Sequence, residues 1–276
     1  MRLATCNICP RQCTIKEGGI GFCNARGNVD GVVTSINYGC VTSLALDPIE
    51  KKPLYQFHPG AKILSVGSFG CNLRCSHCQN HSISMSDKEL ARFEYIEPES
   101  LLSYAVDTVA MGNIGIAFTY NEPLVGYEYV RDCARLVKDK GLYNCVVTNG
   151  YINEEPLLDI IEYIDAFNID LKAFSNEFYR KVKGDLETVK NTIKIAAQYS
   201  HVEVTTLIIP GENDSEEEIE ELAFWLSGID KNIPLHVSRF FPRYQSLDKN
   251  PTPVEDVYKL AKLARKHLNY VYEGNC

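Results

Sequence analysis

Long apolar runs are missing from this 276-residue chain. No stretch approaches the roughly 18–20 consecutive apolar residues that a membrane-spanning helix needs. The first residues, Met1 to Cys6, also lack the apolar core of a secretory signal, so we expect a cytoplasmic protein. The sequence contains no low-complexity segment and no internal repeat either, which argues against a repeat architecture.

Positive charge is also scarce. The chain has 28 Lys and Arg against 36 Asp and Glu, which gives a formal net charge of −8. Binding to nucleic acid or to an anionic membrane needs concentrated positive charge, so we expect neither partner. Hydrophobic residues make up 45% and charged residues 23%, as in ordinary globular proteins. The length suits one large α/β domain with a small appendage.

Cysteine, by contrast, is abundant for a protein expected in the cytoplasm. There are 11 cysteines, an odd number, and seven of them fall in two tight groups. Disulfides are rare in reducing compartments, so this spacing favours metal or cluster ligation over a disulfide framework. Cys133 and Cys145 lie outside the groups, within helix-like and strand-like patterns, and we expect them in the core.

One group consists of Cys71, Cys75 and Cys78, with the spacing C-x3-C-x2-C. It follows residues 61–67, an apolar run of strand length that ends in glycine. The carboxyl ends of strands carry the chemistry of parallel barrels, and thiolates bind soft metals and iron–sulfur clusters. Three cysteines would leave one iron of a four-iron cluster open to a ligand that is not protein. Zinc with a nearby histidine, or buried structural thiols, are the alternatives.

The other group lies in a glycine-rich stretch near the start of the chain. Cys6, Cys9, Cys13 and Cys23 have the spacing C-x2-C-x3-C-x9-C. A small segment of this kind lacks a core of its own, and structural zinc would stabilise it. An auxiliary iron–sulfur cluster is the other interpretation, and Cys40 is a candidate to replace one of the four ligands.

From residue 62 onward, short apolar runs alternate with helix-like segments. Their near-continuous Val, Ile and Leu content indicates strands buried on both faces of a parallel sheet. The predicted strands are 63–66, 114–119, 144–148, 166–171, 202–209 and 235–238. The predicted helices are 98–111, 123–140, 154–163, 185–199, 215–227 and 253–268. Periodicity alone does not distinguish an open doubly wound sheet from a partial barrel.

The organisation before residue 62 is different. Residues 31–36 and 39–44 are predicted to pair as two short strands, and 47–54 reads as a polar, proline-bounded link. We therefore divide the chain into a Cys-rich metal-binding segment, 1–60, and a core domain, 61–276.

Polar residues recur where the predicted strands end. They occupy 119–123, 148–150, 170–172 and 210–214, together with His236 and Arg239. The carboxyl ends of parallel strands meet at one face, which is also the face expected to carry the loop with Cys71, Cys75 and Cys78. The sequence therefore predicts a single active site there.

The cysteine loop followed by β/α units resembles the radical S-adenosylmethionine (SAM) superfamily. Residues 62–240 are similar to the activating enzymes of glycyl-radical enzymes, such as pyruvate formate-lyase activating enzyme. Nearly the whole chain resembles the radical SAM enzymes of the AmmeMemoRadiSam system. The motifs that carry the resemblance are Cys6-Asn7-Ile8-Cys9-Pro10-Arg11-Gln12-Cys13, Gly21-Phe22-Cys23, Asp47-Pro48-Ile49-Glu50-Lys51-Lys52-Pro53-Leu54, the cluster loop with Cys78-Gln79-Asn80, Tyr120-Asn121-Glu122-Pro123 and His236-Val237-Ser238-Arg239-Phe240.

The resemblance implies a partial (β/α)6 TIM-type barrel and a 4Fe-4S cluster on Cys71, Cys75 and Cys78. SAM would bind the open iron through its amino and carboxylate groups. One electron from the reduced cluster would cleave SAM to methionine and a 5′-deoxyadenosyl radical, which would abstract a hydrogen atom from a substrate. The implied partners are SAM, the substrate and an electron donor such as flavodoxin or ferredoxin.

The resemblance also suggests roles for residues around the cluster. Glu122 lies at the position of the family's Gly-Gly-Glu motif, with Tyr120 and Asn121 in place of the glycines, and would bind the ammonium group of SAM. The alternative is a carboxylate that favours a helix N-terminus. His77 precedes Cys78, where the superfamily usually carries an aromatic residue, and we expect it to pack near adenine.

Later strand ends supply further candidates. Thr148 and Asn149 would reach the ribose or carboxylate of SAM, or else form a plain Asn-Gly turn. Asp170 matches the Asp-Leu-Lys of related activating enzymes, in which the Asp lies near a monovalent-cation site. We favour side chains that face the site over a simple surface pair of Asp170 and Lys172.

The last strand end carries His236 and Arg239. By resemblance, His236 would approach the adenosyl or methionine part of SAM, and Arg239 would bind its carboxylate or the substrate. A hydrogen-bonded core histidine is the alternative for His236. If Cys71–Cys78 held zinc instead of a cluster, His77 or His81 would be its fourth ligand.

Three functions fit these patterns. The first is a radical SAM enzyme, an oxidoreductase similar to glycyl-radical activating enzymes, that acts on a protein or peptide. The second is radical chemistry on a small molecule. The third is not an enzyme but an iron–sulfur electron carrier or a zinc-stabilised interaction protein.

Overall fold

The computed structural model describes residues 2–276 and is built on an eight-stranded sheet of order β14-β13-β12-β11-β10-β9-β7-β6. Strand β6 (Ser43–Pro48) is antiparallel to β7, and the other neighbours pair in parallel. The parallel strands are β7 (Lys62–Gly67), β9 (Asn113–Phe118), β10 (Tyr143–Thr148), β11 (Ala166–Asp170), β12 (His201–Ile208), β13 (Leu235–Arg239) and β14 (Val271–Gly274). The six predicted strands are confirmed to within one residue at each end.

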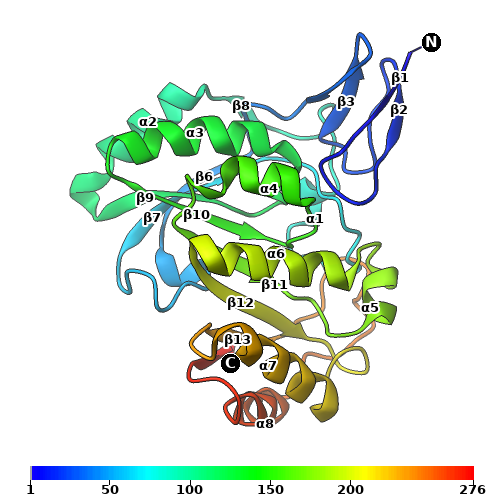
Figure 1. Cartoon of the computed structure of the whole chain (residues 1–276), viewed down its shortest axis with the longest axis vertical. Helices are drawn as coiled ribbons and strands as arrows, with labels where there is room; N and C mark the ends of the chain where they lie inside the picture. The colour runs from blue at the N-terminus through cyan, green and yellow to red at the C-terminus, as the bar shows by residue number, and fades with distance from the viewer. Residues whose placement is uncertain (1) are drawn as a thin grey trace.

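A helix lies on each connection between successive parallel strands (Figure 1). The six predicted helices are α2 (Pro98–Asp107), α3 (Tyr127–Asp139), α4 (Glu154–Ile161), α6 (Leu186–Tyr199), α7 (Glu216–Asp230) and α8 (Val254–Ala264). Shorter helices are α1 (His81–Ser84), α5 (Asn176–Lys181), η1 (Ile49–Lys51), η2 (Val109–Met111) and η3 (Pro123–Gly126). Because β14 and β6 are the two edges of the sheet and do not pair with each other, the β/α units form a partial barrel.

The N-terminal strands form small antiparallel pairs outside the barrel (Figure 1). They are β1 (Leu3–Thr5) with β2 (Thr14–Lys16) and β3 (Arg26–Val29) with β4 (Val32–Ser35). A third antiparallel pair joins β5 (Cys40–Val41) to β8 (Glu94–Tyr95), which comes later in the chain, just before α2. The predicted pairing of 31–36 with 39–44 is wrong. Asp30 and Gly31 both have positive φ, +54° and +89°, and form the tight turn that folds β4 back onto β3.

The predicted polar link at 47–54 is partly strand. Asp47 and Pro48 end β6 and pair with Ile63 and Lys62 of β7, and η1 follows directly. Proline is tolerated there because β6 lies at the sheet edge, where one side of the strand has no ladder partner. The division at residue 60 stays a prediction, and β6 belongs to the same sheet as the core strands.

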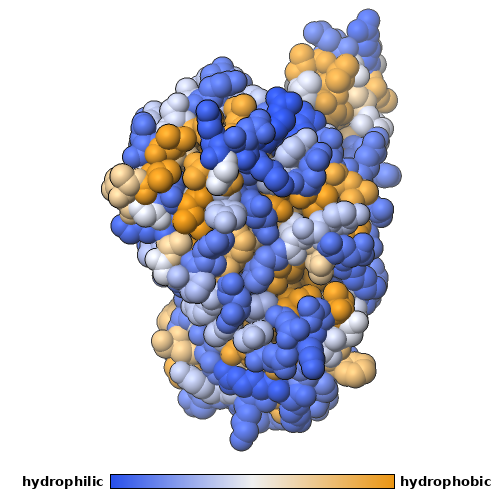
Figure 2. All heavy atoms as spheres, turned by 60° about the vertical axis from the view of Figure 1, so that its left-hand side comes forward, coloured by the Kyte–Doolittle hydropathy of each residue, from blue (hydrophilic) through white to orange (hydrophobic). Residues whose placement is uncertain are grey.

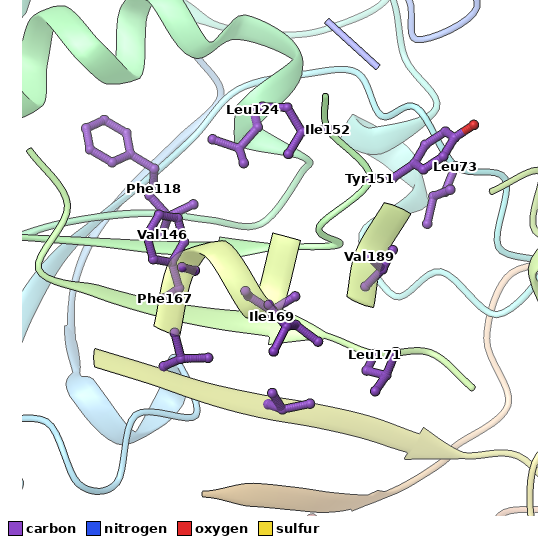
Figure 3. Packing of buried hydrophobic residues seen from close by; sticks show 14 of the residues in the cluster. Leu73, Phe118, Leu124, Val146, Tyr151, Ile152, Phe167, Ile169, Leu171 and Val189 are labelled. Carbon is purple, nitrogen blue, oxygen red and sulfur yellow. The ribbon is translucent and has the colours of Figure 1, made fainter. Parts of the chain in front are cut away.

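The core lies between the sheet and its covering helices. Phe118, Val146 and Phe167 come from three neighbouring strands and are buried side by side in Figure 3. Burying a side chain of this size contributes about 1.5–3 kcal/mol. Cys133 and Cys145 are fully buried among apolar residues, as predicted.

The surface is mixed rather than uniformly polar. In Figure 2 hydrophobic residues appear as scattered patches among hydrophilic ones, including one on the protruding N-terminal lobe. Exposed apolar side chains of that lobe include Leu3, Ile20 and Val32. Across residues 2–276, no helix combines the length and the apolar character needed to cross a membrane.

Candidate functional site

A cavity of about 920 Å³ opens at the carboxyl ends of the parallel strands. Its wall contains every residue predicted for the cluster and SAM sites, so the structure brings them together as expected from a parallel sheet. They are Cys71, Cys75, Cys78, Tyr120, Asn121, Glu122, Thr148, Asn149, Asp170, His236 and Arg239. What these residues bind stays a prediction.

The cysteine loop follows β7 after a glycine, Gly70, whose backbone conformation only glycine adopts easily. Gly70 has a φ of +91°, and a Cβ there would stand 2.6 Å from the carbonyl oxygen of Cys23. The thiols of Cys71, Cys75 and Cys78 are free, and burial raises the pKa of Cys75 to about 11. A metal cation displaces the proton of a thiol that binds it. Three free thiols on one cavity wall therefore fit an iron–sulfur cluster.

Glu122 is 3% exposed and is surrounded by hydrogen-bond donors. Its Oε1 accepts from the backbone N of Leu124 at 3.0 Å and from Thr148 Oγ1 at 2.7 Å, and its Oε2 accepts from Asn149 N at 2.7 Å. Burial raises the pKa of Glu122 to about 7, against the opposing effect of these hydrogen bonds. The carboxylate does cap η3, as the alternative interpretation held, yet Oε2 retains capacity for another donor.

Asn149 connects this acid to the cysteine loop. Its backbone N donates to Glu122, while its Nδ2 lies 3.6 Å from Cys71 Sγ and 3.0 Å from Asn72 Oδ1. Its Oδ1 accepts from the backbone N of Tyr151 at 2.8 Å, which closes the turn. The turn of the alternative interpretation is therefore present, and contact of Asn149 with SAM stays a prediction.

Tyr120 and Asn121 hold the backbone beside the cysteine loop. Asn121 Nδ2 donates to the carbonyl oxygens of Phe69 at 3.2 Å and Gly70 at 3.1 Å, and its Oδ1 accepts from Ser68 N at 2.9 Å. Tyr120 has a φ of +74°, in the left-handed region that glycine adopts easily. This strain fits a position at which the family's motif has glycine.

An acid–base cluster on the cavity wall was missed from the sequence. Asp47 accepts from Lys52 Nζ at 2.9 Å, Lys51 Nζ at 3.0 Å and the Tyr120 hydroxyl at 2.7 Å. Burial would raise the pKa of Asp47, but these hydrogen bonds hold it below its ordinary value. Lys52 is 2% exposed. Two lysines between two prolines are the available signal in the sequence, which predicts a link and a family motif there but no role in the site.

Asp170 and Lys172 form an ion pair, with Lys172 Nζ 2.6 Å from Asp170 Oδ2. Both side chains also line the cavity. The pair is thus present, but on the wall of the site and not on the outer surface. A cation site at Asp170 stays a prediction.

His236 is 2% exposed, and its Nε2 lies 2.6 Å from Oε2 of Glu203. The hydrogen-bonded core histidine is therefore present, while the ring still lines the cavity. Glu203 was missed because its partners are invisible in a single apolar run. Arg239 Nε donates to the carbonyl oxygen of Thr252 at 2.7 Å, and its guanidinium lies 4.8 Å from the Phe241 ring centre.

The two histidines of the cysteine loop have aromatic neighbours. The His77 ring lies 6.3 Å from Phe178 and 6.4 Å from Phe240, and burial lowers its pKa to about 4. His81 stacks on Tyr244, with ring centres 4.4 Å apart. Within residues 2–276, no three His, Cys, Asp or Glu side chains are grouped closely enough to hold a single metal ion.

The four N-terminal cysteines line a second and much smaller pocket. Cys6, Cys9, Cys13 and Cys23 surround a space of about 10 Å³. Burial raises the pKa of Cys23 to about 11. Cys40 is buried in β5 and is not part of this wall.

The two cysteine groups meet directly. The backbone N of Cys71 donates to the carbonyl oxygen of Cys23 at 3.1 Å. The Phe22 ring lies between two guanidinium groups, 3.7 Å from Arg11 and 4.0 Å from Arg74. The N-terminal segment therefore packs against the loop that carries Cys71.

Comparisons with known proteins show which family the chain resembles. The Radical SAM superfamily model matches residues 65–226. An uncharacterized protein of Methanocaldococcus jannaschii is 43% identical over 277 residues, which cover 98% of this chain and 80% of that protein. The pyruvate formate-lyase 1-activating enzyme of Escherichia coli strain K12 is 25% identical over 170 residues, which cover 59% of this chain and 68% of the enzyme.

A solved structure shares the fold. Streptococcus suis SuiB bound to S-adenosylmethionine aligns with a TM-score of 0.59 at 13% identity, over 75% of this chain and 48% of that one. The superfamily model covers more than half of the 276 residues. Superfamily membership also excludes the non-enzyme alternatives, an electron carrier or an interaction protein. This chain therefore belongs to the radical SAM superfamily and is an enzyme.

Proposed function

We propose that this enzyme reductively cleaves SAM and abstracts a hydrogen atom from a protein or peptide substrate, with Cys71, Cys75 and Cys78 as ligands of a 4Fe-4S cluster. When bound, the cluster and SAM of this superfamily supply the electron and the 5′-deoxyadenosyl group for that chemistry. One observation carries the proposal. Three free thiols and the buried Glu122 share the wall of one cavity at the strand ends.

The chain's own residues would bind and orient SAM. Oε2 of Glu122 would accept a hydrogen bond from the amino group of SAM. The backbone N of Asn149 holds Glu122, and the side-chain Nδ2 of Asn149 contacts Cys71. Thr148 fixes the second carboxylate oxygen of Glu122. Arg239, at the end of β13, lies on the cavity wall. We assign its guanidinium to a carboxylate, which belongs either to SAM or to the substrate.

A protein or peptide substrate is supported by likeness to a pyruvate formate-lyase activating enzyme, which by its name acts on another enzyme. The second candidate is a small-molecule substrate, which would share the cavity with SAM. The cavity volume of about 920 Å³ lies within the range of small-molecule pockets, roughly 300–1,000 Å³.

The test of SAM cleavage uses the full chain loaded with iron and sulfide under anaerobic conditions. Dithionite and SAM should then yield 5′-deoxyadenosine and methionine. Cys75→Ala should lose this activity, whereas Cys133→Ala, at a buried thiol of α3, should keep it. Wild-type protein that carries a full cluster and yields no 5′-deoxyadenosine would refute the proposal. Flavodoxin or ferredoxin would be the electron donor in place of dithionite.

Two further measurements separate the substrate classes. With a protein partner of the glycyl-radical class, a glycyl-radical signal should appear by electron spin resonance. Deuterium that passes from a labelled metabolite into 5′-deoxyadenosine would instead favour the small molecule.

For the N-terminal cysteines we propose a second metal centre, either structural zinc or an auxiliary iron–sulfur cluster. Support comes from the shared wall of Cys6, Cys9, Cys13 and Cys23, whose thiols are all free. Binding of one ion would draw these sulfur atoms closer together than they lie within residues 2–276. A triple variant with Cys71, Cys75 and Cys78 changed to Ala isolates this site. Metal analysis should find about one zinc ion or a complete cluster per chain. A folded triple variant without zinc or iron would rule the site out.

A further inference from the structure

Glu203 is a charged residue in the interior of the barrel. It occupies the third position of β12, between Val202 and Val204, and has no exposed surface. An ionised carboxylate in such a place is costly unless charged or hydrogen-bonded partners compensate for the lost water. The arrangement of those partners therefore shows what the carboxylate does.

Three donors from separate parts of the chain converge on this carboxylate. Oε1 accepts from the backbone N of Gln56 at 2.7 Å and from His201 Nε2 at 3.0 Å. Oε2 accepts from His236 Nε2 at 2.6 Å. Burial would raise the pKa of Glu203, but the hydrogen bonds from His201, His236 and the backbone of Tyr55 and Gln56 lower it to about 2. Glu203 is consequently ionised at neutral pH.

An ionised carboxylate only accepts hydrogen bonds, so Nε2 of His236 must carry the hydrogen. In a neutral imidazole the other nitrogen, Nδ1, is then a bare acceptor. Within residues 2–276, Nδ1 of His236 has no hydrogen-bond partner. The ring is held in place by Tyr55, edge-on at 4.8 Å, and by Tyr272, stacked at 5.4 Å.

We propose that Glu203 is a positioning residue that locks His236 in the Nε2–H tautomer, so that Nδ1 is presented on the cavity wall as a hydrogen-bond acceptor. The ligand it suits carries an O–H or N–H donor, as the ribose and amino groups of SAM do. This inference rests on the proposed function, because it takes the cavity to be the SAM site. A tautomer fixed in this way lets the site select a donor without reorganisation on binding.

His201 provides a control within the same network. It makes the same Nε2 contact with the same carboxylate. Its side chain is 29% exposed and lines a different hollow, shared with Gln56, while that of His236 is 2% exposed and lines the reaction cavity. His201→Gln keeps an N–H donor for Oε1 of Glu203, so the state of the His236 ring should not change.

The test reads the ring nitrogens of ¹⁵N-histidine by NMR at about pH 8, where an ordinary histidine is neutral. It uses the full chain, isolated anaerobically with its metal centres, and assigns signals from His236→Gln and His201→Gln. In the wild type the Nε2–H form of His236 should exceed the Nδ1–H form by more than about tenfold. Glu203→Gln, whose amide both donates and accepts, should lower that ratio several-fold, and Glu203→Asp should restore much of it. His201→Gln should leave it unchanged.

The inference is overturned if His236 in the wild type is Nδ1–H or carries a hydrogen on both ring nitrogens at this pH, because Nδ1 is then a donor. It is also overturned if Glu203→Gln leaves the tautomer ratio as it was, since a purely structural acid would alter only stability. Added SAM is the second probe. SAM should shift the ¹⁵N signal of Nδ1 of His236 and leave the ¹⁵N signal of Nδ1 of His201 where it was. If SAM changes the spectrum of the cluster but not the NMR signal of Nδ1 of His236, then Nδ1 does not face the ligand and this part of the inference is wrong. If SAM changes neither, the proposed function fails, and the tautomer measurement still decides the role of Glu203.

Discussion

The two cysteine groups differ in the space they surround. Cys71, Cys75 and Cys78 lie on the wall of a cavity of about 920 Å³ that also carries an acid, amides and a histidine. Cys6, Cys9, Cys13 and Cys23 surround about 10 Å³. Structural metal sites are closed by protein ligands, whereas catalytic sites keep a position open. On the proposed ligand sets, we therefore expect chemistry at the first group and stability from the second.

The contact between the groups makes this division testable. Cys23 accepts a backbone hydrogen bond from Cys71, and Gly70 passes so close to Cys23 that a side chain does not fit. A substitution at Cys71, Cys75 or Cys78 should affect mainly SAM cleavage, and one at the N-terminal cysteines should affect mainly stability. A substitution at the contact between the two groups should affect both.

The largest effect is expected from a reciprocal pair of variants. Cys75→Ala removes a proposed cluster ligand and should lower SAM cleavage by at least about a thousandfold, because even groups that only support a ligand are worth 10–100-fold. Cys9→Ala should instead cost about 3–5 kcal/mol of stability, roughly 10 °C in Tm. SAM cleavage per intact cluster should persist in Cys9→Ala. Product assays, iron analysis and thermal unfolding measure the pair.

The comparison would break if Cys9→Ala lost SAM cleavage per cluster as completely as Cys75→Ala. The N-terminal group would then take part in the chemistry. Cys133→Ala, at a buried thiol outside both groups, serves as the reference for both measurements.

A smaller effect is expected at Glu122, within the open site. Glu122→Gln keeps the shape and removes the charge, so SAM should bind about 10–100-fold more weakly. The pKa of Glu122 is raised from 4.5 to about 7, so the carboxylate forms as the pH rises through 7. Wild-type affinity for SAM, measured by equilibrium dialysis, should therefore increase from pH 6 to 8 by up to about tenfold, while the variant stays flat.

The stability of the fold should change in the opposite direction. A folded pKa above the unfolded one stabilises the protein at low pH, and this contribution is lost as the pH rises from about 4.5 through 7. A loss of SAM binding by Glu122→Gln at pH 8 is therefore not a loss of stability. A variant whose SAM affinity rises with pH as steeply as that of the wild type would show that another group titrates.

The strand order and the cavity wall were predictable because they depend on local patterns. Buried strands such as Ala166–Asp170 read as continuous apolar runs, and their order along the chain matches their order in the sheet. The residues after each strand then had to meet at one face. For this reason the sequence alone predicts that Glu122, Asn149 and His236 lie at the same face of the sheet.

The features that the sequence does not predict, such as the contacts of Glu203 and Asp47, depend on pairing between residues that are distant in the chain. Nothing in the run 202–209 reveals that Glu203 meets a histidine from the next strand and a backbone N–H 147 positions away. Asp47 likewise depends on the hydroxyl of Tyr120, 73 positions along the chain. A buried charge signals that a partner exists but does not identify it.

The contact between the two groups is tested next by Gly70→Ala. Gly70 has a φ of +91°, and a methyl group there would stand 2.6 Å from the carbonyl oxygen of Cys23 and 2.9 Å from Ala25. We expect a cost on the order of 2–3 kcal/mol, together with lower iron content and faster thiol labelling of the N-terminal cysteines. Gly60→Ala is the matched control, because its φ is +83° and nothing lies within 4 Å of its Cβ position. If iron content fell equally in both variants, backbone strain and not the contact would be responsible.

The smallest effect should come from Phe22, whose ring lies 3.7 Å from the guanidinium of Arg11 and 4.0 Å from that of Arg74. Phe22→Leu keeps an apolar side chain and removes both cation–π contacts, which should cost about 1–2 kcal/mol, or roughly 2–4 °C in Tm. SAM cleavage per cluster should not change, because Phe22 does not line the reaction cavity. Phe224→Leu, at an exposed ring on α7, should leave both quantities unaltered. A drop in cleavage per cluster on Phe22→Leu would mean that the N-terminal segment sets the geometry of the open site, so that the closed group contributes to chemistry as well as stability.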